Sequence, residues 1–327
     1  MGTNMMVRVN YLEGWRLRAL ILSIVAATAG YLAFSLWGGW NEVVAAFVQI
    51  GLVGTLIALC LSLMNYALRF CRWQLYLSQL GHCVAWPPSL RIYLSGFALT
   101  TTPGKAGEAF RGVLLKQRGV PFPATFAAFI SERLSDLVAI VLLTLVGLAQ
   151  YPQARGIVLA GVLGIVVVLI CLSSQTLLDR LHRWASARQG KLMALVTHVS
   201  EMLGGARRCH RPGLLGVATV ISVVAWGAEA LAFYWMLGWL GADISLSFAI
   251  FVYALSMLAG ALSFLPGGLG SAEAVMVSLL VLKGMTMPAA IAATVFIRLA
   301  TLWFAVMIGL VALIHSRHGE SSAEETA

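Results

Sequence analysis

The segment LTTTPGKAGEAFRGVLLKQRG, residues 99–119, breaks an apolar stretch at a Pro-Gly pair and then places charged residues beside the break. A second segment, LSFLPGGLGSAEAVMVSLLVLKG at residues 262–284, contains the same kind of break. Proline favours the first turn of a helix and glycine allows close backbone approach, so each break predicts a half-helix that begins at membrane depth. The residues that form the two breaks are Pro103, Gly104, Gly107, Pro266, Gly267, Gly268 and Gly270.

The composition indicates a polytopic, all-α membrane protein. Of the 327 residues, 60% are hydrophobic and 11% are charged, which is typical of a chain that crosses the bilayer several times. The net charge of +9 comes from basic residues between the apolar stretches, where they set orientation and meet anionic lipid rather than nucleic acid. The stretches predicted to span the membrane are 17–37, 46–68, 124–149, 156–173, 214–240 and 288–314, and the two that run into a break are 88–102 and 245–265.

The two halves of the chain resemble each other. The segment GVPFPATFAAFISERLSDL from Gly119 aligns without gaps on GMTMPAAIAATVFIRLATL from Gly284, with identity at 8 of 19 positions. The identities include Arg133 and Arg298, and each copy follows its own Pro-Gly break. We therefore predict an internal repeat.

Counting Lys and Arg favours one membrane topology. If both stretches that end in Pro-Gly cross fully, giving eight spans, 8 basic residues lie inside and 11 outside. If each turns back at its break as a re-entrant hairpin, six full spans remain, 17 basic residues lie inside, and only Arg155 and Lys283 lie outside. The positive-inside rule favours the second arrangement, in which the two halves run in opposite directions as an inverted repeat. Residues 245–265 are also long enough to span the membrane alone, so both courses stay open for them.

The domain boundaries follow from this topology. The chain, residues 1–327, forms a single integral membrane domain with a first repeat at 46–149 and a second at 214–314. A basic linker at 174–213 is expected to be amphipathic and to lie on the anionic cytoplasmic leaflet. Residues 316–327 are polar and expected to be a disordered tail.

Charged residues at membrane depth are the candidate substrate-binding residues. Because an isolated charge there costs about 3 kcal/mol or more, such side chains must face one another or a polar cavity. Half-helix N-termini also favour an anion such as a phosphate. The candidates are Lys105, Glu108, Arg111, Glu132, Arg133, Asp136, Glu273 and Arg298.

Other readings of the charged and aromatic residues stay open. The charges could be buried ion pairs that fix helix packing, for instance Glu132 with Arg298, while Asp136 lies one turn from Arg133. We interpret Arg69 and Arg72 as interfacial residues whose charged ends reach the membrane surface, with attraction of a lipid headgroup as the alternative. We interpret five tryptophans as interfacial anchors, with stacking platforms as the alternative: Trp73, Trp86, Trp226, Trp235 and Trp239. Neither a phosphate-binding loop nor metal-ligand spacing is present, so we expect no cofactor and no metal.

The motifs NYALRFCRWQLYLSQLG, PGKAGEAFRGVLL, SERLSD and PGGLGSAEAVMVSLL, with the late Arg298, occur in this order along nearly the whole chain. In this series the sequence resembles the lysylphosphatidylglycerol synthase transmembrane-region family, also called flippase-like domain proteins. The resemblance implies a multi-pass protein of the bacterial inner membrane that moves a phospholipid or lipid-linked glycan between leaflets. The synthases carry a C-terminal transferase domain that we do not find before Ala327, so we expect no synthase activity and no enzyme.

We therefore expect a lipid flippase with both termini in the cytoplasm. Its partners would be lipids with anionic or phosphate-containing headgroups, a coupling proton or ion, and envelope-biosynthesis enzymes. The alternatives are an intramembrane transferase that modifies a lipid, using Glu132 and Asp136 beside Arg133, and a scaffold for envelope enzymes.

Overall fold

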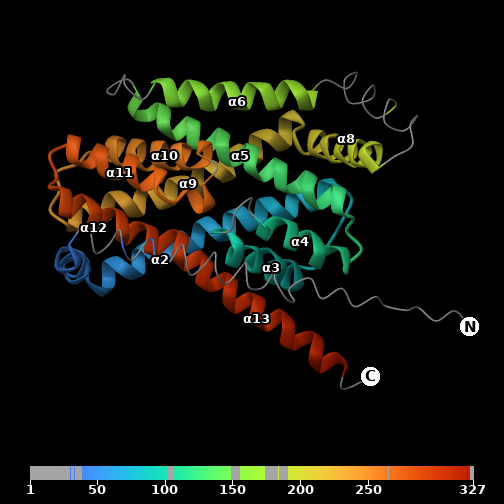
Figure 1. Ribbon diagram of the computed structural model, residues 1–327, viewed down its shortest axis with the longest axis horizontal. Coiled ribbons are helices and arrows are strands. Elements are labelled where there is room, and N and C mark those ends of the chain that lie inside the picture. The colour runs from blue at the N-terminus through green and yellow to red at the C-terminus, as the bar shows by residue number, and fades with distance from the viewer. Residues whose placement is uncertain are drawn as a thin grey trace, which may run out of the picture.

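The computed structural model describes residues 39–101, 106–148, 155–173, 191–263 and 265–324, together with positions 30, 33 and 183. Within these residues the chain is helical and contains no strand (Figure 1). The predicted first span, 17–37, falls almost wholly outside the described residues. Pro103, Gly104 and Lys105 of the first break also lie outside them.

The helices follow the apolar stretches of the sequence. The first half contains α2 (Trp40–Gln79), α3 (Trp86–Ser95), the 3₁₀ turn η1 (Gly96–Leu99), α4 (Ala106–Lys116), α5 (Phe122–Leu148) and α6 (Arg155–Ser173). It is followed by α8 (Lys191–Cys209). The second half contains α9 (Pro212–Trp239), α10 (Leu246–Leu262), the 3₁₀ turn η4 (Pro266–Gly268), α11 (Ser271–Leu282), α12 (Met287–Arg298), the π-helical turn η5 (Leu299–Trp303) and α13 (Phe304–Glu324).

Three helical stretches in the described part of the chain are long and apolar enough to cross a membrane. They are Trp40–Gln79, Pro212–Trp239 and Met287–His315. Shorter apolar helices lie at Arg155–Val167, Leu246–Leu262 and Pro266–Leu282. The all-helical class and the membrane character of the predicted fold are therefore confirmed, whereas the division into six spans and two hairpins stays a prediction.

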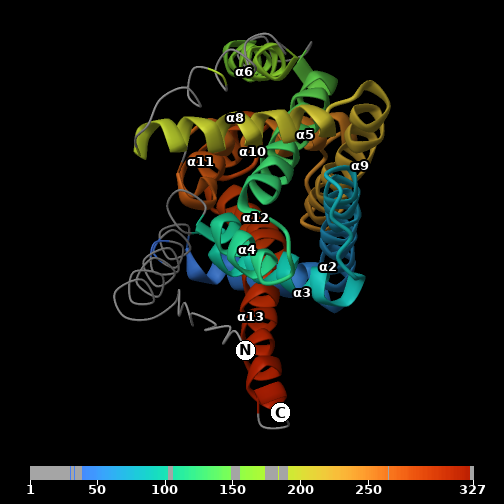
Figure 2. The same ribbon diagram turned by 90° about the vertical axis from the view of Figure 1, so that its right-hand side faces the viewer.

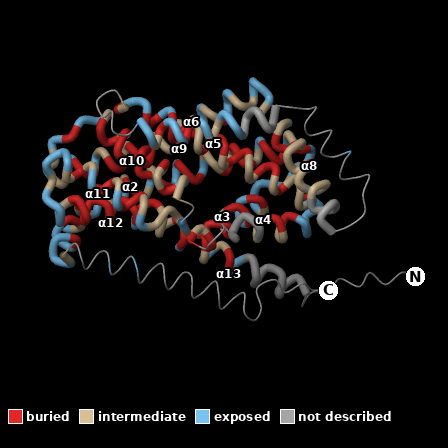
Figure 3. The backbone as a smooth tube through the Cα atoms, turned by 45° about the horizontal axis from the view of Figure 1, so that its top comes forward, coloured by how far each residue is buried: buried red, intermediate tan, exposed pale blue. Residues whose placement is uncertain are grey.

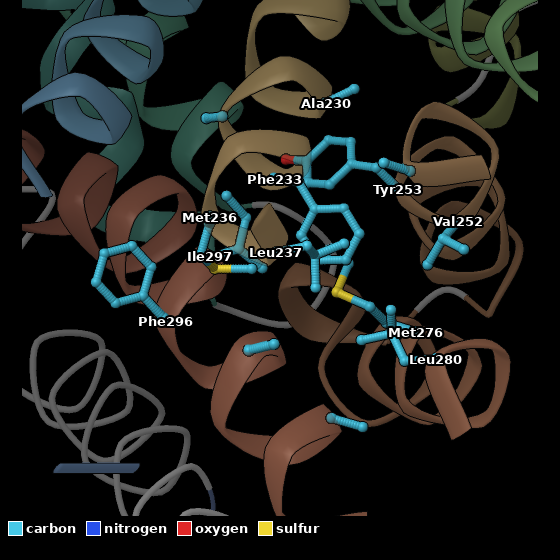
Figure 4. Close-up of a cluster of buried hydrophobic side chains, with 14 of the residues drawn as sticks. Ala230, Phe233, Met236, Leu237, Val252, Tyr253, Met276, Leu280, Phe296 and Ile297 are labelled. Carbon is cyan, nitrogen blue, oxygen red and sulfur yellow. The ribbon is translucent and has the colours of Figure 1, made fainter. Parts of the chain in front are cut away.

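Two of the long apolar helices, α2 and α9, lie side by side, and other helices pack around them. Helix α2 runs along α9, while α5 packs against α10, α9 and α8 (Figures 1 and 2). Buried positions run through the middle of this bundle (Figure 3). Figure 4 shows its core, in which Phe233 of α9 lies near Tyr253 of α10 and Met276 of α11, and Met236 of α9 lies near Ile297 of α12. The rings of Phe233 and Tyr253 lie 5.9 Å apart, which fixes α9 against α10.

The same order of local structures occurs in both halves. Gly119 and Gly284, with φ of 80° and 100°, lie in the turns from α4 to α5 and from α11 to α12. The N–H groups of Val120 and Met285, at equivalent positions 165 residues apart, bond to the carbonyls of Leu115 and Leu280. Helices α5 and α12 then begin at positions 122 and 287, again 165 apart. The local structure therefore recurs where the sequence predicts a repeat, and the opposite orientation of the halves stays a prediction.

Two helices extend away from this core. Helix α8 packs across α5 (Figure 2), within the segment predicted to be an amphipathic linker. Helix α13 packs against α3 and η1 and then projects beyond the bundle (Figures 1 and 2). It continues to Glu324, so the structure describes a helix over most of residues 316–327, where the sequence predicts a disordered tail.

Candidate functional site

Four arginines and two carboxylates come together between α2, α4 and α5. We call this group the arginine cluster, and its members are Arg69, Arg72, Arg111, Glu132, Arg133 and Asp136. Glu132 and Asp136 lie one turn apart on α5, so both carboxylates face the same neighbouring helices. Glu132 is ten residues from the start of α5, or about 15 Å along the helix axis. The cluster therefore lies inside the bundle rather than at the end of a helix.

Asp136 is the centre of the arginine cluster. Its carboxylate accepts a hydrogen bond from Arg72 Nη1 at 2.8 Å and lies 3.3 Å from Arg69 Nη2 and 3.1 Å from Arg133 Nη2. Trp226 of α9 donates its indole N–H to the same carboxylate at 3.1 Å. A single carboxylate thus holds three guanidinium groups and ties α2, α5 and α9 together.

Glu132 holds the remaining arginine. The Glu132 carboxylate lies 3.1 Å from Arg111 Nη1 and 4.0 Å from Arg72 Nη2. The Arg111 guanidinium also lies over the rings of Tyr93, at 4.3 Å from the ring centre, and of Trp73, at 5.3 Å. These aromatic faces attract a cation and exclude water, so they hold Arg111 on α4 in a fixed position.

The arginine cluster has more positive than negative charge. Four guanidiniums face two carboxylates, an excess of two positive charges among the side chains that the structure describes. Buried guanidinium nitrogens without a hydrogen-bond acceptor are Nε of Arg69, Nε and Nη2 of Arg72, Nε of Arg111 and Nε of Arg133. Buried donors are normally satisfied, and planar guanidiniums suit carboxylate or phosphate oxygens. The arrangement is therefore suited to binding an anion.

The second break carries a separate, balanced ion pair. Arg298 Nε on α12 lies 2.6 Å from a carboxylate oxygen of Glu273, and its Nη2 donates to the Gly267 carbonyl at 2.8 Å. The other Glu273 oxygen accepts the Gly270 N–H at 2.6 Å, at the start of α11. We call this contact the Glu273–Arg298 pair. It joins α11, α12 and η4 with one charge of each sign.

The chain is similar in sequence to known membrane proteins. Residues 19–309 match the family described as the lysylphosphatidylglycerol synthase TM region. The chain belongs to this family. It is also similar to a UPF0104 membrane protein of Methanothermobacter thermautotrophicus, with 26% identity over 86% of this chain and 88% of the relative. A UPF0104 membrane protein of Pyrococcus horikoshii is 21% identical over 92% of this chain and 98% of the relative. The resemblance seen in the motifs is thus confirmed.

The structure of this family member brings together four of the predicted substrate-binding residues, Arg111, Glu132, Arg133 and Asp136. Glu273 and Arg298 meet each other in the separate pair. Pro266, Gly267 and Gly268 form η4, and Gly270 is the N-cap of α11, as a helix break requires. Gly107 and Glu108 lie in α4, but the Glu108 side chain is outside the described residues, as are Pro103, Gly104 and Lys105.

Two interpretations of the arginines are wrong. Arg72 and Arg69 do not reach the membrane surface, because their side chains are 0% and 11% exposed and pair with Asp136. Their partner lies 64 to 67 residues away in the sequence, so the pattern of α2 alone does not show it. Glu132 pairs with Arg111 and not with Arg298, because Arg298 is held by Glu273.

The interpretation is wrong for two of the tryptophans, and for Trp86, Trp235 and Trp239 it stays a prediction. Trp73 is fully buried beside Arg111, and Trp226 donates to Asp136, so neither is an interfacial anchor. Both lie next to buried arginines, which attract an aromatic face and a hydrogen-bond donor to the charged site. Trp86 and Trp235 are exposed, as an interfacial position requires.

Proposed function

We propose that the protein is a lipid flippase of the bacterial inner membrane, which moves a phospholipid or lipid-linked glycan between leaflets. The observation that supports this most is the excess of positive charge in the arginine cluster, whose side chains other than the partly exposed Arg133 are at most 11% exposed. The phosphate of a lipid headgroup would supply the missing negative charge and accept the unpaired N–H groups. The family of membrane proteins to which the chain belongs supports a role with lipids.

The Glu273–Arg298 pair differs from the arginine cluster in its balance of positive and negative charge. Buried charges that serve only to fix helix packing need equal numbers of each sign, because an uncompensated buried charge is strongly destabilising. The Glu273–Arg298 pair meets that requirement and is also bonded to the backbone of the break. The arginine cluster does not meet it, which favours a ligand over a purely structural role.

The shape of the second half supports a re-entrant hairpin. Helix α10 has 17 residues and is therefore about 25 Å long, which is shorter than the roughly 30 Å hydrocarbon layer. After η4 the chain returns as α11, which packs against α10 (Figure 1). An inverted repeat of such hairpins would give a headgroup a polar path from each side of the membrane.

The alternative of an intramembrane transferase requires carboxylates that are available as acid and base. Its candidates, Glu132 and Asp136, both lie in ion pairs with arginines. A carboxylate in such a pair positions a cation more readily than it accepts a substrate proton. The geometry therefore favours binding and transport over chemical transfer.

Lipid movement in proteoliposomes tests this proposal. We expect the wild type to move a fluorescent phosphatidylglycerol between leaflets, and Arg133→Gln to reduce the rate at least about tenfold, the equivalent of losing about 1.4 kcal/mol of interaction. Arg133 is the best position to change, because its side chain is 30% exposed and its loss should be tolerated by the fold. The matched control is Arg155→Gln, an exposed arginine at the start of α6 that should keep the wild-type rate. A wild type no faster than protein-free liposomes would refute the proposal.

A further inference from the structure

Glu229 is a buried carboxyl group that none of the ion pairs uses. It lies in α9, ten residues before the end of the helix at Trp239, and is 4% exposed. Tyr253 of α10 donates its hydroxyl to Glu229 Oε2 at 2.5 Å. No lysine or arginine nitrogen of the described side chains lies within 4.0 Å of Glu229. In this respect it differs from Glu132, Asp136 and Glu273.

Charged and titratable groups surround Glu229 on each helix that packs against α9. They are Tyr66 and Arg69 of α2, Asp136 of α5, Tyr253 of α10 and Arg298 of α12. A positive charge near a buried carboxyl group favours its ionised form, and a second carboxylate opposes it. Because Arg69 belongs to the arginine cluster and Arg298 to the Glu273–Arg298 pair, Glu229 responds to the charge of both groups.

Two opposing effects act on the charge of Glu229. Burial without a contacting cation disfavours the ionised carboxylate strongly. The excess positive charge of the arginine cluster favours it, although from beyond contact distance. An anion bound in the cluster would cancel the attraction of its positive charge, and the cost of burying an ionised carboxylate would remain. Binding of a phosphate should therefore be accompanied by protonation of Glu229.

We propose that Glu229 takes up the proton that is coupled to lipid transport. The inference rests on the proposed flippase function and adds the coupling ion and its site. A proton from water binds a carboxylate oxygen of Glu229 when a headgroup phosphate enters the arginine cluster, and it leaves when the headgroup leaves. Because linkage is reciprocal, protonation of Glu229 also strengthens phosphate binding.

Proton uptake by the purified full-length protein in detergent tests this coupling. A pH indicator in weak buffer is followed while short-chain phosphatidylglycerol is added, and lipid binding is measured in parallel. We expect the wild type to take up as much as about one proton per lipid bound. Glu229→Gln, which keeps an acceptor for Tyr253, should bind lipid and lose the uptake. The matched control Glu201→Gln, at an exposed position of α8, should keep it. Equal uptake by the wild type and Glu229→Gln would overturn the inference.

A second variant tests the inference in case Glu229→Gln folds poorly. Tyr253→Phe removes the hydrogen bond that favours the ionised carboxylate, so the midpoint of proton uptake should move up by roughly one pH unit. An unchanged midpoint would contradict the role of Glu229.

Transport in liposomes separates this inference from the proposed function. If the wild type neither binds nor moves lipid, the flippase proposal fails. If it moves lipid without proton uptake and at a rate independent of pH, the flippase proposal stands and the assignment of Glu229 fails.

Discussion

At the scale of single residues, Asp136 decides whether the arginine cluster can exist. Three guanidiniums lie within 3.3 Å of its carboxylate, so Asp136→Asn would leave them with Glu132 as the one remaining counter-charge in the cluster. Removing one partner of a buried ion pair costs about 3–5 kcal/mol. We expect Asp136→Asn to lower the free energy of unfolding by about this amount, measured by denaturant unfolding in detergent. The exposed control Glu201→Gln should unfold like the wild type, and a similar result for Asp136→Asn would show that Asp136 does not hold the arginines.

The residues that the sequence predicts correctly are those whose partners are close in the chain. Arg133 and Asp136 are three positions apart on one helix, so their contact follows from helical spacing. The contacts of Arg72 and Trp226 with Asp136 join different helices and span 64 and 90 positions. One sequence contains no signal for which helices will pack together. Because buried charges must pair, the sequence indicates that partners for Arg72 and Asp136 exist, but it does not identify them.

At the scale of helices, the sequence predicts where each helix lies, but it does not predict kinks or π-helical turns within the helices. Every predicted apolar stretch that falls within the described residues is helical. The kink at Gly51 in α2 and the π-helical turn η5 after Arg298 were not predicted. The kink lies at a glycine that adopts a φ of 67°, and the π-helical turn makes a contact with another helix. In η5, the Thr301 carbonyl accepts a hydrogen bond from the Tyr66 hydroxyl of α2 at 2.5 Å.

The crossing of α13 over η1 depends on one glycine. A Cβ atom at Gly309 would lie 2.7 Å from the carbonyl carbon of Phe97 and 2.9 Å from the carbonyl oxygen of Leu94, and it would overlap the backbone nitrogen of Ala98. Backbone atoms cannot move aside as a flexible side chain can, so the two elements must separate. We expect Gly309→Ala to destabilise the protein by about 1–3 kcal/mol, measured by thermal unfolding in detergent. Gly216→Ala in α9, where a Cβ meets nothing within 4 Å, is the control and should not destabilise. Equal melting of both variants would contradict the close crossing.

At the scale of the whole molecule, the two topologies place two segments on opposite sides of the membrane. The arrangement with six spans and two hairpins puts the basic linker inside and the turn between α9 and α10 outside. The arrangement with eight spans reverses both. Charge supports the first, because the linker carries seven Lys or Arg residues between positions 179 and 213.

Labelling of single cysteines in cells distinguishes these topologies. In a background without the five native cysteines, Ser186→Cys reports on the linker and Asp243→Cys on the exposed turn before α10. We expect a membrane-impermeant maleimide to label position 243 in intact cells and to label position 186 only after the membrane is opened. The opposite pattern would require α10 to cross the membrane fully. The arginine cluster would then remain, but the two halves could no longer be inverted copies, and a headgroup would need a different path to the cluster.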